Sequence, residues 1–293
     1  MSITLKPLHK HFAAQASGID LNQPLSPKDV KEINDAMNEY AVLIWNNQPL
    51  TQAEQMRFAQ SFGNLDIGLK RVFKRPERFD YEEIIDISNV DAQGQVVKRD
   101  SPKNLSNFAN MLWHSDSSFQ NPRAAYSMLS AVIIPTWGGN TEFVDLRAAY
   151  DRLPEDIKEQ IKNLKCEHFA LHTRLLLGDD AYTDDQKKAI PPTTWPLVTT
   201  HPGSNRKVLF VGVHATHIID WPIAEGRMYL KDLLEHATTP DMIYSHQWQV
   251  GDLVMWDNRS TLHRGRRYDL NQRRELRRTT INDEPLESNT KTA

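Results

Sequence analysis

Two histidines and one aspartate in this chain have the types and the spacing of a metal site. His114 and Asp116 are two residues apart, and His263 follows far downstream. Residues at i and i+2 of a strand project to the same side, so His114 and Asp116 can chelate one ion together, whereas His263 must come from another strand. Two imidazoles and one carboxylate cover one face of an ion and leave the opposite face open for a co-substrate and O₂. This donor set is typical of non-haem Fe(II) oxygenases.

Two arginines near the end of the chain have the chemistry to bind carboxylates. Arg274 and Arg278 lie in residues 273–281, a stretch whose β-branched end predicts a strand. On a strand these two side chains share one face, about 13 Å apart at ~3.3 Å per residue. A planar guanidinium grips a carboxylate with two hydrogen bonds, so each arginine is suited to hold one carboxylate. Arg273 and Arg277 point to the opposite face, where we expect a solvated basic surface.

Neighbouring segments indicate how these residues are positioned. A tight turn at residues 251–252 precedes an apolar run that predicts a buried strand, and the end of that strand delivers His263 onto a loop. Gly138 and Gly139 mark a turn after the strand-like residues 126–134. Thr141 follows this turn, and its hydroxyl is placed to reach a carboxylate.

The remaining pattern predicts helices early in the chain and many short strands later. Capping-box sequences at Ser26 and Thr51 begin two helices, and the second ends near Gly63. The polar stretches 91–107 and 178–194 are expected to be loops, the first near the site entrance and the second a lid or surface loop. Other elements are predicted by periodicity, as helices at 146–153, 154–164 and 225–237 and as strands at 41–45, 84–90 and 208–212. This order suggests a mainly β fold with flanking helices, built on a double-stranded β-helix (jelly-roll) core.

Length and composition limit the class of protein. The chain has 293 residues, of which 39% are hydrophobic, and we expect one catalytic domain over 1–293 with a frayed polar tail at 282–293. A net charge of −3 favours neither nucleic acid nor an anionic membrane as a partner. The single cysteine, Cys166, excludes an internal disulfide and predicts a buried thiol in a reducing compartment. Without a signal-peptide core or an apolar run of ~20 residues, a cytoplasmic protein is expected.

Three segments of the sequence resemble a known family. Residues 107–119, 138–143 and 256–278 are similar to the Fe(II)- and 2-oxoglutarate-dependent dioxygenases of the taurine dioxygenase superfamily, and the similarity extends over roughly residues 5–284. Within that superfamily the chain is most similar to the branch that cleaves aryloxyacetate herbicides such as 2,4-dichlorophenoxyacetate. No departure occurs at the metal or 2-oxoglutarate positions. Departures occur elsewhere, for example in the basic stretch 70–75, which leaves the substrate end less defined than the chemistry.

The resemblance assigns roles to the residues already singled out. It implies that the triad of His114, Asp116 and His263 binds Fe(II). It implies that Arg274 and Thr141 bind the C5 carboxylate of 2-oxoglutarate and that Arg278 binds the carboxylate of a small anionic substrate. Second candidates for substrate binding are Asn110 and Arg71.

The resemblance also implies the reaction. Fe(II), 2-oxoglutarate and O₂ would hydroxylate the substrate carbon next to the ether oxygen, with release of succinate and CO₂. The hemiacetal product collapses to a phenol and glyoxylate, so the net result is ether cleavage. The metal and co-substrate carry this chemistry, while the protein supplies geometry and exclusion of water. We also expect a homo-oligomer.

Several alternatives remain open from the sequence. The substrate is instead taurine or an alkylsulfonate if the arginine fork holds a sulfonate. The chain is a non-catalytic jelly-roll binding protein if it kept only the fold, although the intact triad and both arginines argue against this. A zinc hydrolase with the same ligands lacks an obvious adjacent general base. A different metal site would need His214 and His217 on one helical turn, but no carboxylate accompanies them at a fixed spacing.

Overall fold

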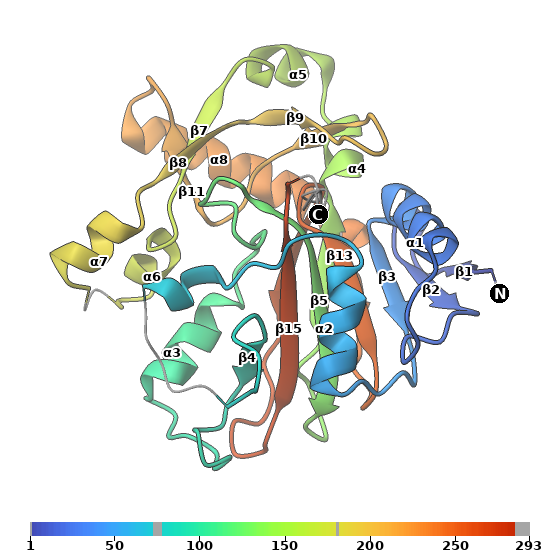
Figure 1. The fold of residues 1–293 in the computed structure, drawn as a ribbon. Helices are drawn as coiled ribbons and strands as arrows, with labels where there is room; N and C mark the ends of the chain where they lie inside the picture. Colours follow the sequence, from blue (N-terminus) through green and yellow to red (C-terminus); the bar gives the residue numbers. More distant parts are fainter. Residues whose placement is uncertain (1, 73–77, 180–181, 285–293) are drawn as a thin grey trace, which may run out of the picture.

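The computed structural model describes residues 2–72, 78–179 and 182–284. Seven strands of this described chain form the largest sheet (Figure 1). In spatial order they are β1 (Thr4–Pro7), β2 (Ala14–Ser17), β3 (Val42–Trp45), β13 (Leu253–Asp257), β5 (Ala124–Ile133), β15 (Glu275–Asn282) and β4 (Ile85–Ser88). β2 and β3 pair in parallel, and the other neighbours pair antiparallel. The strand β15, late in the sequence, therefore lies inside the sheet.

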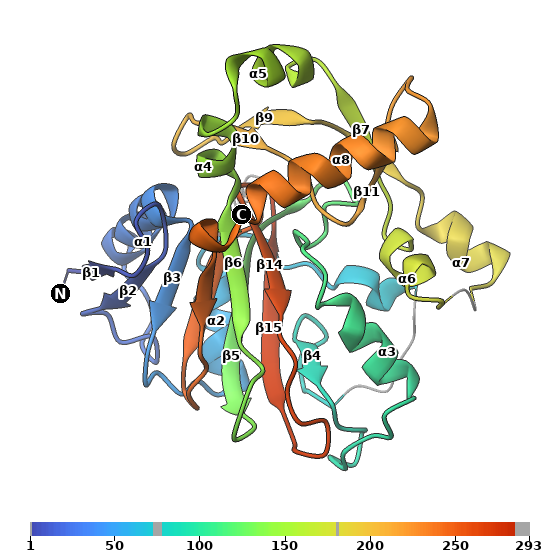
Figure 2. The ribbon, with the colours of Figure 1, turned by 180° about the vertical axis from the view of Figure 1, so that it is seen from behind.

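A smaller sheet faces the large one. Its strands are, in spatial order, β12 (Tyr244–His246), β6 (Thr141–Asp145) and β14 (Thr261–Gly265). Phe143 of β6 packs against Leu129, Val254 and Leu276 of the large sheet, so a hydrophobic core fills the space between the two sheets. Figure 2 shows β6 and β14 with the large sheet from behind. Two facing sheets with helices outside confirm the predicted mainly β, jelly-roll fold.

Helices cover the outer face of the large sheet, so its central strands are buried on both sides. α1 (Pro27–Tyr40) and α2 (Gln52–Gln60) pack there, and Met255 of β13 points into this outer cluster. Its neighbours Val254 and Trp256 point the other way, into the core between the sheets. Burial of both faces explains why this strand has a continuous apolar sequence instead of an alternating one.

The remaining elements surround the two sheets. The helices are α3 (Pro102–Ala109), α4 (Leu146–Asp151), α5 (Glu155–Ile161), α6 (His172–Leu176), α7 (Asp184–Ala189) and α8 (Ile223–Ala237), with 3₁₀ turns η1 (Gly68–Arg71) and η2 (Pro240–Met242). A third sheet has the order β11 (Ala215–Ile218), β7 (Lys165–His168), β8 (Thr193–Pro196), and β9 (Val198–Thr200) pairs with β10 (Lys207–Leu209). α8 crosses this upper part of the molecule, where Leu230 and Leu233 pack into a core with the buried thiol Cys166 (Figures 1 and 2).

Both predicted capping boxes are confirmed. Ser26 and Asp29 exchange hydrogen bonds between side chain and main chain at the start of α1, and Thr51 and Glu54 do the same at the start of α2. These reciprocal bonds satisfy main-chain N–H groups that lack a partner in the first turn of a helix. The predicted helices around 146–153, 154–164 and 225–237 are likewise present, with slightly shorter bounds for the first two.

Two segments predicted as loops contain helices. The stretch 91–107 includes most of α3, which begins at Ser101 as N-cap with Pro102 at the first position. The stretch 178–194 includes α7, which Thr183 caps in a capping box, although residues 180–181 lie outside the described part. In both cases the sequence contains the capping residues of a helix. The prediction of a loop rests on the high polarity of the segment and gives these capping residues too little weight.

Two further local predictions are wrong. His263 lies within β14, not on a loop. The alternative metal site that needs His214 and His217 on one helical turn is not supported, because His217 lies in β11 and His214 directly precedes that strand. The chain beyond 281 is partly ordered, because Asn282 ends β15 and Asp283 forms ion pairs with two arginines. The rest of the predicted tail, residues 285–293, lies outside the described residues.

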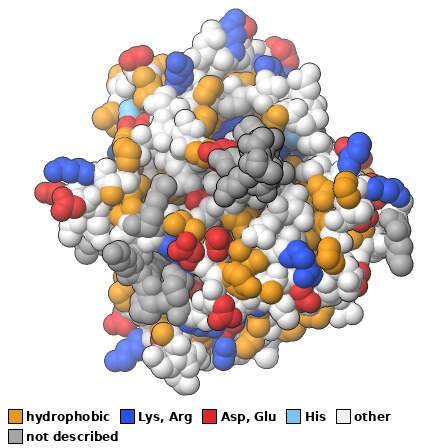
Figure 3. All heavy atoms as spheres, viewed as in Figure 1, with side chains coloured by type: hydrophobic (Ala, Val, Ile, Leu, Met, Phe, Trp, Pro, Cys, Tyr) orange, Lys and Arg blue, Asp and Glu red, His pale blue; other side chains and the backbone are white. Residues whose placement is uncertain are grey.

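The surface carries charges of both signs. On the face viewed in Figure 3, basic and acidic side chains are interspersed and do not gather by sign. Among the described residues, no helix combines the length and the apolar character that crossing a membrane requires.

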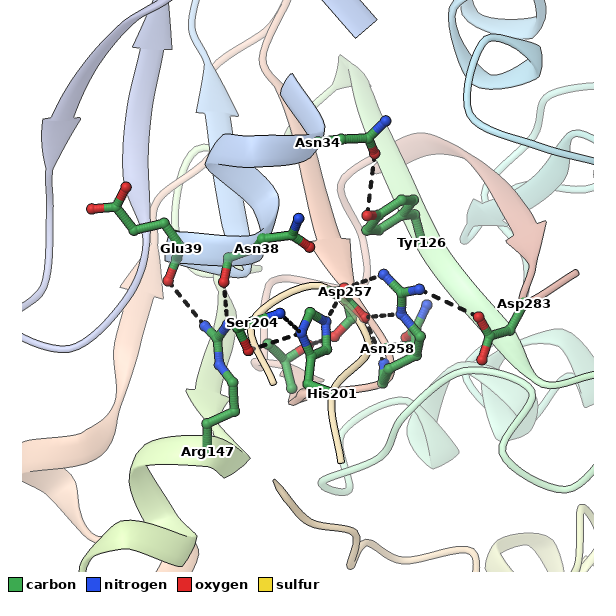
Figure 4. Close-up of polar contacts among 12 residues, drawn as sticks. Asn34, Asn38, Glu39, Tyr126, Arg147, His201, Ser204, Asp257, Asn258 and Asp283 are labelled. Carbon is green, nitrogen blue, oxygen red and sulfur yellow. Dashed lines mark hydrogen bonds and ion pairs between the residues drawn. The ribbon is translucent and has the colours of Figure 1, made fainter. Parts of the chain in front are cut away.

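A buried ionic network fixes the turn between β13 and β14. Asp257 accepts a hydrogen bond from Arg259 Nη2 at 2.6 Å. It accepts a second from His201 Nε2 at 2.9 Å (Figure 4). Arg259 also pairs with Asp283 at 3.3 Å. Burial alone would raise the pKa of Asp257, but Arg259 and His201 lower it well below its ordinary value. The pairing therefore stabilises the ionised carboxylate inside the protein.

Asp257→Asn should destabilise the fold by about 3–5 kcal/mol at neutral pH, because the buried Arg259 loses the closer and more deeply buried of its two carboxylate partners. Urea unfolding and the melting temperature measure this change. A group with a depressed folded-state pKa stabilises the fold above its unfolded pKa, so the difference from wild type should shrink as pH falls below about 4. Asp241→Asn is the control, since Asp241 pairs with Arg152 on the surface. Equal stability of Asp257→Asn and wild type at neutral pH would contradict this account.

Candidate metal centre

His114, Asp116 and His263 converge on one point in the protein interior. One ligand atom from each residue lies within 4.8 Å of the others, and all three residues are buried. Asp116 Oδ1 is 3.9 Å from His114 Nε2, and Asp116 Oδ2 is 3.8 Å from His263 Nε2. Donors that each lie ~2.0–2.2 Å from a metal stand roughly 3 to 4 Å apart, so this spacing suits one ion.

Main-chain pairing places the two histidines side by side. The N–H of His114 donates to the carbonyl of His263 at 3.0 Å, and the N–H of His263 donates back at 2.8 Å. The expectation that the second histidine comes from another strand is confirmed, because His263 lies in β14. The first pair differs from expectation: His114 forms an isolated bridge, and Asp116 begins a turn in which Ser117 has a φ of 51°.

The protonation states suit metal binding. His114 Nδ1 lies 2.7 Å from the carbonyl of Leu112, and a proton on Nδ1 that bonds to this carbonyl leaves Nε2 free as a ligand. Burial lowers the pKa of His114 and of His263, which favours neutral imidazoles. Burial would raise the pKa of Asp116, but the charge of Arg278 lowers it below its ordinary value. At neutral pH the centre thus offers two neutral imidazoles and a carboxylate.

A narrow cavity of about 60 Å³ leads from the triad to Arg274. Arg274 is only 8% exposed, and its Nη2 donates to the carbonyl of Gly139 at 3.0 Å. Its Nε has no hydrogen-bond partner among the described residues, and burial lowers its pKa. No carboxylate of the described chain pairs with this guanidinium. A buried cation without a counter-ion is costly, so the cavity suits an anionic ligand.

Thr141 lines the same narrow cavity, and Trp248 orients it. Trp248 Nε1 donates to Thr141 Oγ1 at 3.0 Å, so the threonine keeps its own proton for another acceptor. Gly139 has a φ of +72°, and a Cβ there would lie 3.0 Å from Arg274 Nε, so glycine permits the close approach of main chain and guanidinium. The sequence pattern does not predict this role of Trp248, because the role depends on a contact with Thr141 that only the folded structure shows.

A larger cavity of about 610 Å³ lies beside the triad. It is bounded by η1, α3 and α6, and His114 and Arg278 line both cavities. Apolar side chains form much of its wall, among them Ile67, Leu69, Ile85, Val97 and Phe119. A metal held by the triad would therefore lie where a narrow, cationic cavity meets a wide, largely apolar one.

Arg278 lies closer to the metal centre than its sequence position suggested. Its Nη1 is 2.5 Å from Asp116 Oδ1. Arg274 and Arg278 line the same cavity, but Arg274 precedes β15 and the strand register shifts next to it, so Arg274 does not lie on the predicted common face of that strand. Arg273 is exposed, as expected. Arg277 is half-buried and donates to the carbonyl of Leu50, so the prediction of a solvated side chain is wrong for this residue.

The second candidates for substrate binding have different outcomes. Asn110 is the C-cap of α3 and lines both cavities. Arg71 ends η1, but its side chain lies outside the described part of the structure. The structure adds His214, which is buried in the wall of the larger cavity with its ring 6.1 Å from that of His114. Its Nδ1 has no partner among the described residues, and it stands apart from the three clustered donors.

The chain belongs to the taurine catabolism dioxygenase TauD, TfdA family, whose profile matches residues 4–280. It is 55% identical over 286 residues to the alpha-ketoglutarate-dependent 2,4-dichlorophenoxyacetate dioxygenase of Cupriavidus pinatubonensis, covering 98% of this chain and 100% of that one. It is 33% identical to the (S)-phenoxypropionate/alpha-ketoglutarate-dioxygenase of Sphingobium herbicidovorans, covering 96% and 95% of the two chains. The solved structure of AAD-2 in complex with Mn(II) and N-oxalylglycine superposes with a TM-score of 0.92 at 43% identity, covering 97% of this chain and 99% of that one. The protein is thus an oxidoreductase.

Proposed function

We propose that the protein is an Fe(II)- and 2-oxoglutarate-dependent dioxygenase that hydroxylates aryloxyacetates on the carbon next to the ether oxygen. The observation that carries this proposal is the position of the triad of His114, Asp116 and His263 between the two cavities. The names of the relatives support the substrate class, since two of them act on phenoxy acids.

Arg274 and Thr141 would hold the co-substrate. The unpaired guanidinium at the end of the narrow cavity suits the C5 carboxylate of 2-oxoglutarate, and the free proton of Thr141 suits a second hydrogen bond to it. The other end of the same cavity opens on His114 and His263, where the keto acid end would reach the metal.

Arg278 would hold the substrate carboxylate at the edge of the larger cavity, where the apolar wall suits an aromatic ring. Held by His114, Asp116 and His263, Fe(II) would supply the O₂ chemistry that yields succinate and CO₂ from 2-oxoglutarate and a hydroxyl group on the substrate carbon. The hydroxylated product is a hemiacetal, and cleavage of its ether C–O bond gives a phenol and glyoxylate without a further oxidant. Asn110 and His214 would add hydrogen bonds to the substrate, and Arg71 remains a further candidate.

An anaerobic titration tests both halves of the proposal. Protein with Fe(II) and 2-oxoglutarate should develop the weak visible charge-transfer band of the chelate. Phenoxyacetate, a chlorinated phenoxyacetate and taurine are then supplied separately with O₂, and succinate and phenol are measured. Phenol release with either aryloxyacetate supports the proposed substrate class. Succinate coupled only to taurine would replace that class with a sulfonate, and no band would contradict the metal centre.

Arg274→Ala should raise the KM for 2-oxoglutarate by roughly 30-fold or more, because truncating one partner of a buried charged pair costs about 2–5 kcal/mol. Thr141→Val should raise it less, by about tenfold, since a single hydrogen bond to a charged group is lost. Steady-state kinetics at saturating Fe(II) measure both. Arg273→Ala, which removes an exposed guanidinium next in sequence, is the control. A larger effect on the KM for aryloxyacetate than for 2-oxoglutarate would contradict this assignment.

Three broader expectations accompany this proposal. We propose a single catalytic domain over residues 1–293, a homo-oligomeric assembly and a cytoplasmic location; light scattering and cell fractionation measure the last two. The alternative of a non-catalytic binding protein is wrong, because the chain belongs to a dioxygenase family. The same membership leaves the zinc hydrolase alternative without support.

A further inference from the structure

A chain of buried hydrogen bonds ends at the carboxylate of Asp116. Asn258 Nδ2 lies 2.9 Å from Ser127 Oγ, and Ser127 Oγ lies 2.8 Å from Asp116 Oδ2. The three residues are 1%, 0% and 5% exposed, in that order. Ser127 comes from β5 and Asn258 from the turn after β13, so the chain links two neighbouring strands of the large sheet to the metal centre.

The direction of each hydrogen bond in this chain is fixed by its neighbours. Asn258 Oδ1 accepts from Trp256 Nε1 at 3.0 Å and from the N–H of Asp116 at 3.1 Å. The amide oxygen is thereby occupied, so the amide nitrogen must face Ser127. Ser127 accepts that bond and donates its one proton to the carboxylate, which can only accept, so Thr280 Oγ1, at 3.2 Å from Ser127 Oγ, is a donor to Ser127. Donation therefore runs from Asn258 to Ser127 to Asp116.

The support behind Asn258 is rigid. Its main-chain N–H donates to the carbonyl of Ala125 at 2.8 Å, and its own carbonyl accepts from Ser115 Oγ at 2.6 Å. Its neighbour Asp257 is locked by the ionic network with Arg259, and Figure 4 shows Asn258 beside that network. The amide is thus held by groups that do not depend on a bound metal.

The two oxygens of Asp116 are held from different sides. Ser127 holds Oδ2, while Arg278 Nη1 lies on Oδ1. Turning the carboxylate about its Cβ–Cγ bond would break the bond to Ser127. Arg278 also has a substrate to bind under the proposed function, so Ser127 is the partner whose hold on the carboxylate can persist throughout a catalytic cycle.

We propose that Ser127 and Asn258 are positioning residues that fix the Asp116 carboxylate for the metal and so raise the affinity of the protein for Fe(II). This inference rests on the proposed metal centre. Neither residue lines either of the two cavities or belongs to the three clustered donors. Loss of an outer partner of a metal ligand typically costs about 10–100-fold in metal affinity, because the ligand must then be ordered by the metal itself.

The test uses the variants Ser127→Ala and Asn258→Ala and the double variant. Each full-length protein is stripped of metal and titrated anaerobically with Fe(II) at saturating 2-oxoglutarate, following the charge-transfer band, and with Mn(II) by calorimetry. Each single variant should raise the apparent Kd by about 10–100-fold. The double variant should lose less than the product of the two single losses, since both variants break the shared bond between Asn258 and Ser127, although Asn258 also accepts from the N–H of Asp116. The KM for 2-oxoglutarate at saturating Fe(II) should stay within about twofold of the wild-type value. The reason is that the chain of bonds to Asp116 and the residues proposed to bind 2-oxoglutarate share no partner, and groups without a shared partner act independently.

Ser130→Ala is the matched control, because Ser130 is a buried serine of the same strand β5 and lies outside this chain of bonds. It should bind Fe(II) as the wild type does. Ser127→Ala removes a single oxygen atom and gives a result even if Asn258→Ala fails to fold, which its melting temperature would show. Wild-type affinity in Ser127→Ala would overturn the inference, as would losses that multiply in the double variant. Failure of the wild type to bind Fe(II) would overturn the metal centre itself, so the two failures are distinguishable.

Discussion

Replacing Asp116 with alanine should abolish iron-dependent turnover. Under the proposed mechanism the protein supplies three metal donors, and Asp116 is the one that carries charge. Losing it removes several kcal/mol of metal interaction, and each ~1.4 kcal/mol is tenfold in rate, so kcat/KM should fall by at least about a thousandfold. The same result is expected for His114→Ala. Succinate and phenol formation at saturating Fe(II) measure the loss.

A histidine outside the triad gives the matched control for this experiment. His217 is half-buried in β11 and pairs with Glu167 at 3.8 Å, away from the three clustered donors. His217→Ala should keep activity near that of the wild type. Because Asp116→Ala also leaves Arg278 without its partner, the melting temperature of each variant must be measured beside its activity. Turnover within about tenfold of wild type in Asp116→Ala would sink the proposed metal centre.

Arg278→Ala should raise the KM for an aryloxyacetate by roughly 30-fold or more, with a much smaller effect on the KM for 2-oxoglutarate. The reason is the desolvated pair that this guanidinium would form with the substrate carboxylate, whose loss costs on the order of 2–5 kcal/mol. Initial-rate kinetics with each co-substrate varied in turn measure the two constants. Similar increases for both co-substrates would defeat the role given to Arg278.

The contact between Arg278 and Asp116 adds a second effect to this variant. With Nη1 at 2.5 Å from Oδ1, removal of the guanidinium also changes the surroundings of the metal carboxylate. The kinetics should therefore be run at saturating Fe(II), and the affinity for Fe(II) should be measured separately. Arg277→Ala is the control, because Arg277 is adjacent on β15 and points away to the carbonyl of Leu50.

The sequence carried enough information for the metal donors because chemistry and spacing are local properties. His114 and Asp116 are close in sequence, and few other residue types bind a metal, so their convergence could be anticipated even though Asp116 lies in a turn. The jelly-roll core was also predictable, since the order of elements, with helices early and many short strands later, indicates it. The sequence does not predict the helices α3 and α7, because both are short and polar. Few of their residues are buried, so they lack the periodic apolar pattern that a buried helix face produces.

Residues that act through tertiary contacts could not be found from the sequence. Trp248 is 107 positions from Thr141, and Ser127 is 131 positions from Asn258, so no periodic pattern links either pair. A sequence-based alternative pairs His214 with His217 as metal ligands, whereas the structure places His214 in the wall of the larger cavity. Each of these roles depends on which strands are neighbours, and strand order is a property of the whole fold.

Strand order also bears on how the protein is made. β15 comes after every other strand of the described chain, yet it lies between β5 and β4 in the large sheet. A chain still emerging from the ribosome presents His114 and Asp116 long before His263 and Arg278 have been synthesised. Such a chain has two of the three proposed donors and an open sheet edge on β5. Under the proposed ligand set, tight binding of iron would follow synthesis of β14, the strand that carries His263.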